Sequence, residues 1–273
     1  MPELPEVETT RRGISPHLMG HTVTHLEIRE RRMRWPVDDS VLQIIGHPIT
    51  RIHRRAKYLL IDCETGTLIL HLGMSGSIRI CTHDVELKKH DHFIMQLDSH
   101  QELRLHDPRR FGAILWHHRH DGDTRNHPLL KHLGPEPLEQ TFHANYLIST
   151  CTGRTTSIKQ HIMNSKIVVG VGNIYACEAL FRSGIHPTRS AGRISKPRLI
   201  KLTQDIKNVL TEAITQGGTT LRDFLREDGK PGYFKQKLNV YDRQGEPCRH
   251  CDTTLKKIVI SNRSTYYCPM CQR

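Results

Sequence analysis

Two pairs of cysteines near the end of the chain constrain its fold more than any other feature. They form Cys248-x2-Cys251 and Cys268-x2-Cys271, and 16 residues separate one pair from the other. This spacing allows two tight turns to present four thiolates tetrahedrally to one Zn²⁺ ion. Because four protein ligands leave no open position for a substrate, we expect the zinc to be structural and not catalytic.

The stretch between the cysteine pairs predicts a β-hairpin. It covers residues 255–267, with Asn262, Arg263 and Ser264 near the expected tip. Polar turn residues between two β-prone runs favour such a turn. A tip held in place by zinc can project one arginine into a ligand.

The charge of the chain indicates a polyanionic partner. Its 273 residues include 40 Lys and Arg against 28 Asp and Glu, which gives a formal charge of +12 and a pI near 9.5. Such a field attracts polyanions over a distance, and nucleic acid is the leading candidate. A basic pI can also simply favour solubility, or reflect binding to an anionic membrane surface.

The sequence predicts a cytoplasmic protein without a membrane anchor. It holds no apolar run near the ~20 residues that a membrane span needs, and its acidic, proline-containing start lacks an apolar signal core. The cysteines outside the two pairs lie singly in unrelated apolar contexts, as reduced core residues do. These are Cys63, Cys81, Cys151 and Cys177.

The first half of the chain predicts a β-sandwich or barrel. A short helix is expected from Pro5, with Glu6 and Glu8 in its first turn and Gly20 after its end. Regularly spaced β-type runs divided by turn residues then follow. They are residues 21–29, 58–63, 67–72, 77–80, 93–97, 102–106 and 112–116.

The segment Leu133-Gly-Pro-Glu-Pro-Leu138 marks the expected domain boundary, because its two prolines remove hydrogen-bond donors and fix the backbone. Beyond it the apolar period becomes helical, with Ser195 as a possible cap and the glycines from Gly217 as the stop. The periodic apolar residues are Leu199, Leu202, Ile206, Val209, Leu210 and Ala213. The second domain is therefore predicted to be mainly helical.

Three internal motifs each allow a nucleic-acid contact, and each also has an ordinary structural explanation. Gly170 and Gly172 precede a helix that is expected to begin near Asn173. The free N–H groups of this helix start can hold a phosphate, or the glycines can simply belong to a loop before the helix. The turn Asp107-Pro-Arg-Arg-Phe-Gly112 can place arginine on a base edge and phenylalanine between bases, or be an exposed turn. Met74 lies in a glycine-flanked turn, although an isolated methionine usually fills a core.

The amino terminus can supply a nucleophile. Removal of Met1 would expose the secondary amine of Pro2, and an α-amino pKa of about 7.7–8.0 leaves part of it neutral at physiological pH. Such an amine can attack a sugar carbon and form an iminium, while Glu3 supplies a proton. A Met-Pro start is also common, and Lys57 before a β-type run is by itself an ordinary solvated or phosphate-binding charge.

Together the motifs resemble those of bacterial formamidopyrimidine-DNA glycosylase, in the family's order and over the whole chain. The resemblance implies an α+β fold: a β-sandwich with a flanking helix over residues 1–132, a linker over 133–138, a helical domain with a helix-two-turn-helix element over 139–235, and a four-cysteine zinc finger over 236–273. It also implies a monomer and a base-capping loop near residues 217–234. The motifs that carry it are Pro2-Glu-Leu-Pro-Glu-Val-Glu8, Arg55-Ala-Lys-Tyr58, His71-Leu-Gly-Met-Ser-Gly76, Asp107-Pro-Arg-Arg-Phe-Gly112, Val169-Gly-Val-Gly-Asn-Ile-Tyr175 and the cysteine pairs.

The resemblance also implies an activity and its catalytic groups. The family removes oxidised purines, chiefly 8-oxoguanine opposite cytosine and formamidopyrimidines, from double-stranded DNA and then cleaves the strand at the abasic site. By position, Pro2 matches the nucleophile and Glu3 the acid. Lys57 matches the proton donor for β-elimination, and Arg263 the one for δ-elimination.

Other residues match the family's DNA contacts. Met74, Arg109 and Phe111 match the trio that fills the space left by an extruded base. Extruding a base costs a few kcal/mol, so side chains that fill the space are needed. The remaining matches are His90 and Arg154 as DNA contacts, and Lys159 and Asn173 as phosphate contacts. Thr152-Gly-Arg-Thr155 departs from the family, where relatives often carry a lysine-rich run.

Two alternatives compete with this interpretation. Endonuclease VIII, a sister enzyme for oxidised pyrimidines, usually begins Pro-Glu-Gly-Pro and lacks the Arg-x-Phe filler, whereas this chain has Leu4, Arg109 and Phe111. The second alternative is a non-catalytic DNA-binding protein that uses the helical element and the zinc hairpin alone.

Overall fold

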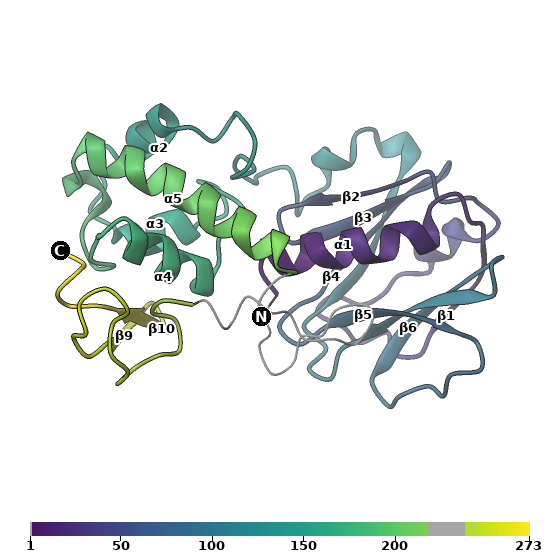
Figure 1. Ribbon diagram of the computed structural model, residues 1–273. Coiled ribbons are helices and arrows are strands. Elements are labelled where there is room, and N and C mark those ends of the chain that lie inside the picture. Colours follow the sequence, from purple (N-terminus) through teal and green to yellow (C-terminus); the bar gives the residue numbers. More distant parts are fainter. Residues whose placement is uncertain (1, 218–237) are drawn as a thin grey trace. The chain divides into compact units, whose positions relative to one another are not determined.

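The computed structural model describes residues 2–217 and 238–273, which fall into two compact units (Figure 1). Of the described residues, the first unit contains 2–131 and 216–217, and the second contains 132–215 together with 238–273. Apart from Gly217, the predicted base-capping loop lies outside the described residues. Among the helices of the described ranges, none is long and apolar enough to cross a membrane.

The first unit is a sandwich of two four-stranded antiparallel sheets, as predicted. Their facing sides share one apolar core, with Phe93 and Leu105 from one sheet and Leu59 and Leu70 from the other. One sheet has the order β1 (Val23–Ile28), β6 (Asp91–Leu97), β7 (Gln101–His106), β5 (Ser77–Thr82); the other has the order β2 (Arg51–Arg55), β3 (Tyr58–Asp62), β4 (Gly66–His71), β8 (Ala113–His118).

Helix α1 (Leu4–Leu18) covers one open side of the sandwich, where it contacts the edge strands β2 and β5 (Figure 1). It buries Val7, Ile14 and Leu18, which share a helical face because they lie seven and four residues apart. The helix begins at Leu4, one residue before the predicted start, and ends before Gly20 at φ +79°. The start of α1 is thereby fixed to the strands.

Strand β2 was not predicted from the sequence. Its residues Arg51–Arg55 read Arg-Ile-His-Arg-Arg, and of these only Ile52 is buried. It is an edge strand that pairs with β3, so its other side chains need no apolar partner. Short 3₁₀ turns complete the unit at η1 (Asp39–Ile44), η2 (Arg119–Asp121) and η3 (Thr124–Asn126).

The second unit is helical and ends in a β-hairpin, as predicted. Its longest helix, α5, buries the periodic apolar residues named above and stops before Gly217, whose φ is +81°. The elements are α2 (Ala144–Cys151), α3 (Ile158–Met163), α4 (Asn173–Arg182), η4 (Ala191–Arg193), α5 (Lys196–Thr215), β9 (Lys256–Ile260) and β10 (Arg263–Tyr267).

The zinc-finger segment shares a small core with α4. Cys177 and Phe181 of α4 pack against Val240, Leu255 and Tyr266. The finger therefore lies in one compact unit with the helices.

A buried carboxylate reinforces this contact. Glu178 is 0% exposed and accepts hydrogen bonds from three consecutive backbone N–H groups, those of Asn239 (2.8 Å), Val240 (2.9 Å) and Tyr241 (3.0 Å). Charge-assisted hydrogen bonds of this kind are about twice as strong as neutral ones. The chain entering the finger is thus clamped to α4.

Candidate functional site

The amino-terminal residues lie in a buried position at the start of α1. Pro2 is buried, Glu3 is 1% exposed and Glu6 is 2% exposed. The Glu3 backbone N–H donates to Glu6 Oε2 at 2.8 Å, which satisfies one of the free donors of the helix start. The proline nitrogen and the Glu3 carboxyl are therefore held on one rigid turn.

Lys57 lies in the two-residue turn between β2 and β3, where Arg55 pairs with Tyr58. The preceding Ala56 has φ +54°, a left-handed conformation that costs a non-glycine residue energy. Arg54 Nη1 donates to the Ala56 carbonyl at 2.6 Å and so supports this turn. The strained conformation of Ala56 is therefore maintained by contacts with its surroundings. Backbone strain of this kind is common at functional sites, where it fixes the direction of a side chain such as that of Lys57.

An ion pair joins the Lys57 hairpin to α1. Glu8 Oε2 lies 3.5 Å from Arg54 Nε, and Arg11 donates to Glu8 Oε1 at 2.8 Å. Burial raises the pKa of Glu8, but hydrogen bonds from Arg11 and Arg12 outweigh it and lower the pKa below the ordinary value. The carboxylate stays charged at neutral pH and connects the helix that begins after Glu3 to the strand that leads to Lys57.

His71, which we did not select from the sequence, lies at the end of β4 opposite Tyr58, with ring centroids 4.8 Å apart. Its Nδ1 accepts from the Gly73 N–H at 3.0 Å, so the ring proton is on Nε2. Burial, together with the positive charges of Lys57 and Arg34, lowers the pKa of His71 to about 4. It is thus a neutral hydrogen-bond donor near Lys57. The signal in the sequence was its place as first residue of the His-Leu-Gly-Met-Ser-Gly motif.

The predicted filler residues lie on two loops that touch. A Cβ atom on Gly73, whose φ is +63°, would lie 2.4 Å from the backbone carbon of Phe111, so only glycine fits there. Met74 and Phe111 are 38% and 44% exposed, and Arg109 Cζ lies 5.1 Å from the Phe111 ring centroid. The structure therefore brings these three side chains to adjacent loops and leaves the two apolar ones in solvent.

Asp107 joins these two loops. It is 0% exposed; its Oδ1 accepts from Ser75 Oγ at 2.9 Å and its Oδ2 accepts from the Gly112 N–H at 2.7 Å. One donor belongs to the Met74 loop and the other to the Phe111 loop. A single buried carboxylate thus sets the spacing of the filler residues.

Replacing Asp107 with asparagine is expected to destabilise the protein by about 2–3 kcal/mol, because a buried acceptor becomes an amide donor facing another donor. Affinity for a duplex containing an abasic site should fall as well. Denaturant unfolding and a binding titration would measure the two effects. The matched control is Asp98→Asn, since Asp98 also holds one side chain and one backbone N–H but is 45% exposed. Its cost should stay within about 0.5 kcal/mol, and equal losses in both variants would contradict the assignment.

His90 lies beside a second buried carboxylate. Its ring packs edge-to-face with the rings of His92 and His106, with centroids 5.8 Å apart in both cases. His106 Nδ1 lies 2.9 Å from Oδ1 of Asp91, which is 0% exposed. Burial raises the pKa of Asp91, but hydrogen bonds from His106, the Lys88 N–H and Arg79 lower it to about 2. The Asp91 carboxylate is therefore charged at neutral pH and fixes His106, the ring that packs against His90.

In the second unit, Arg154 and Lys159 occupy opposite environments. Arg154 is exposed in the turn after α2, next to Gly153 at φ +70°. Lys159 is 1% exposed, and its Nζ donates to Asn173 Oδ1 (2.5 Å) and Thr265 Oγ1 (2.6 Å). Asn173, the first residue of α4, also donates from Nδ2 to the Ser264 carbonyl at 2.8 Å. Lys159 therefore joins α3, α4 and β10, and its contact with a DNA phosphate stays a prediction.

Arg263 is the first residue of β10 and is exposed. The turn before it consists of Ser261 and Asn262, with φ +47° and +59°, and Arg263 pairs with Ile260. Two left-handed residues in a two-residue loop are typical of a type I′ turn, which matches the twist of the strands. Asn262 thus lies in the turn and Arg263 directly after it, near the tip as predicted.

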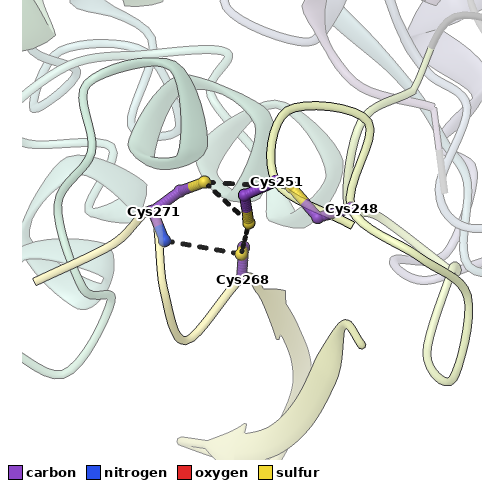
Figure 2. Close-up of side chains that lie close together, drawn as sticks. All are labelled: Cys248, Cys251, Cys268 and Cys271. Atoms are coloured by element: carbon purple, nitrogen blue, oxygen red, sulfur yellow. Dashed lines mark hydrogen bonds between the residues drawn. The ribbon is translucent and has the colours of Figure 1, made fainter. Parts of the chain in front are cut away.

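The four cysteines of the finger converge on one point (Figure 2). All Sγ atoms lie within 4.8 Å of one another, with separations of 3.5 Å for Cys251–Cys268, 3.4 Å for Cys251–Cys271 and 3.9 Å for Cys248–Cys271. A disulfide needs about 2.05 Å, whereas a tetrahedron with Zn–S bonds of about 2.3 Å has edges of about 3.8 Å. The set fits one structural Zn²⁺, as predicted.

Comparison with known domain families matches three successive parts of the chain. Residues 1–114 match the formamidopyrimidine-DNA glycosylase N-terminal domain, and residues 133–225 match the formamidopyrimidine-DNA glycosylase H2TH domain. Residues 245–273 match the zinc finger found in FPG and IleRS.

Whole proteins match over the full length. Formamidopyrimidine-DNA glycosylases of Thioalkalivibrio sulfidiphilus and Alcanivorax borkumensis are 59% and 53% identical, with 100% of each chain covered. The crystal structure of MutM (Fpg) from Thermus thermophilus has a TM-score of 0.89 at 37% identity, covering 99% of this chain and 98% of that one. A Lactococcus lactis Fpg complex with abasic-site DNA has a TM-score of 0.91 at 31% identity, with 99% of both chains covered. The chain with its buried Pro2, its touching filler loops and its four-cysteine finger belongs to the formamidopyrimidine-DNA glycosylase family.

Proposed function

We propose that this DNA glycosylase of base excision repair removes oxidised purines, with Pro2 as nucleophile, and then cleaves the strand. The observation that carries the proposal is the entry to α1, where the buried Pro2 adjoins the buried carboxyl of Glu3, the residue that caps the helix. A secondary amine and an acid on one rigid turn are what an attack on a sugar carbon requires.

Each step follows from one of the groups described above. After removal of Met1, the Pro2 nitrogen forms a bond to C1′ of the extruded nucleotide as the bond from C1′ to the base breaks, and the amine proton leaves with the base. Glu3 then protonates O4′, the C1′–O4′ bond breaks, and the opened sugar is held as an iminium. The resulting iminium makes the C2′ proton acidic, and its loss expels the 3′-phosphate. Lys57 serves this β-elimination and Arg263 serves the δ-elimination that expels the 5′-phosphate, so a one-nucleotide gap remains.

The remaining predicted residues would hold the DNA. Met74 and Phe111 are exposed apolar side chains of the kind that fill an opened base stack. Arg109, next to Phe111, would face the unpaired cytosine, and His90, Arg154, Lys159 and Asn173 would contact or support the backbone. The place of action would be the cytoplasm, at the nucleoid.

Relatives support DNA as the substrate and keep the range of lesions open. Lactococcus lactis Fpg has been crystallised with DNA containing Fapy-dG, an abasic site and an oxidised pyrimidine. A comparison of rates is therefore needed, because binding alone does not identify the preferred base.

The test compares single-turnover excision of 8-oxoguanine opposite cytosine with that of thymine glycol. We expect the first to be faster, and Glu3→Gln to slow it by about 10²–10⁴-fold, the usual contribution of a general acid. A preference for thymine glycol would favour an endonuclease VIII-like enzyme. Tight binding with no excision of either base would favour a non-catalytic DNA-binding protein.

A further inference from the structure

The tip of the zinc hairpin faces helix α3 across a small pocket. Gln160 and Asn164 line it from the helical side, and Ser261 and Arg263 line it from the hairpin. Arg263 is thus part of a wall that α3 shapes. The contacts between the two walls therefore set the position of the Arg263 backbone, from which its side chain extends.

The side-chain amide of Gln160 connects the two walls. Its Oε1 accepts from Ser157 Oγ at 2.8 Å, and Ser157 Oγ in turn accepts from the Gln160 N–H at 3.3 Å at the start of α3. Its Nε2 donates to Ser261 Oγ. Both the oxygen and the nitrogen of the amide are hydrogen-bonded. The bond to Ser157 fixes the amide on α3, and the bond to Ser261 fixes the hairpin turn relative to the amide.

Arg263 lies between two such attachments. Two residues before it, Ser261 is tied to Gln160; two residues after it, Thr265 accepts from the buried ammonium of Lys159 at 2.6 Å. The turn between Ser261 and Arg263 is short and left-handed, so it transmits the position of Ser261 to Arg263 with little slack. The hydrogen bond from Lys159 to Thr265 is buried, whereas the hydrogen bond from Gln160 to Ser261 is exposed.

We propose that Gln160 is a positioning residue for Arg263 in the δ-elimination step. The proposal rests on the function assigned to Arg263 above and names the contact that aims it. Because one exposed hydrogen bond contributes about 1 kcal/mol, its loss should slow δ-elimination by about fivefold. Base excision and β-elimination use Pro2, Glu3 and Lys57 and should keep their rates.

The experiment uses the full-length, zinc-loaded protein and a duplex with a preformed abasic site, under single-turnover conditions. Gel separation of the β and β,δ products gives each rate for wild type, Gln160→Ala, Ser261→Ala and the double variant. The δ rate should fall about fivefold in each single variant, and the double variant should be no slower, because both changes remove one contact. Gln204→Ala is the matched control, since Gln204 is an exposed helical glutamine that donates to Asn208 on α5.

Three results would overturn the proposal. They are an unchanged δ rate in Gln160→Ala, additive losses in the double variant, and an equal loss in the β and δ rates with lowered zinc content, which would indicate a merely structural role. An Arg263→Gln variant separates this from the proposed function. If Arg263→Gln retains δ-elimination, the role of Arg263 fails; if it loses δ-elimination while Gln160→Ala does not, the positioning role alone fails.

Discussion

A Pro2→Gly variant is expected to lose covalent capture by 8-oxoguanine duplex in the presence of borohydride, by about 10²-fold or more. Borohydride reduces the iminium between Pro2 and the sugar to a stable amine, so the wild-type chain should be trapped. The variant has the primary amine of a glycine in place of the secondary amine of Pro2. Glycine lacks the buried ring that fixes this amine before α1, so its amine is more mobile. Denaturing gels would measure the trapped fraction with time.

A form that retains Met1 provides the control for folding and binding. Its Pro2 nitrogen is an amide and has no nucleophilic lone pair, so this form should bind the duplex with the affinity of the processed chain and yield no adduct. A Pro2→Gly variant that is trapped at the normal rate, or a Met1-retaining form that is trapped, would contradict the assignment.

Removing the zinc ion is expected to abolish δ-elimination and weaken DNA binding by about tenfold or more, while Pro2 stays reactive. The finger has a core of only a few side chains on α4, and zinc binding contributes about 10–16 kcal/mol to the folding of comparable peptides. Without it β9 and β10 lose their support, and each lost phosphate or base contact costs about 1–3 kcal/mol. Strand-cleavage products and binding titrations on chelator-treated protein would measure both effects.

The matched control replaces a cysteine outside the cluster. Cys268→Ser should reproduce the effect of chelation, whereas Cys81→Ser should not, because Cys81 lies half-buried on β5 in the other compact unit. Borohydride trapping at saturating DNA should persist in Cys268→Ser. Full δ-elimination in the zinc-free protein would show that the finger does not act through Arg263. Loss of borohydride trapping on zinc removal would show the same.

Local patterns were sufficient where one segment carries the whole signal. The cysteine spacing predicted the zinc site, the regularly spaced β-type runs predicted seven of the eight strands of the sandwich, and the period of residues 199–213 predicted α5. Strand β2 was not predicted because its side chains are mostly charged. It is an edge strand held by backbone hydrogen bonds to β3, which leave no apolar pattern in the sequence. Lys159 was predicted only as a phosphate contact, since nothing nearby in the sequence shows that Asn173 and Thr265 will enclose its ammonium.

The zinc cluster and the sandwich were thus determined by the sequence itself, because each depends on neighbouring residues or a short repeat, and the reactivity of the amino terminus stays a prediction from the sequence. The tertiary structure alone decided which side chains support the site. Asp107 joins two loops through Ser75 and Gly112, and Gln160 meets Ser261 from 101 positions away. Such contacts join polar groups whose separation along the chain follows no period, so only the packing of the core brings them within hydrogen-bonding distance.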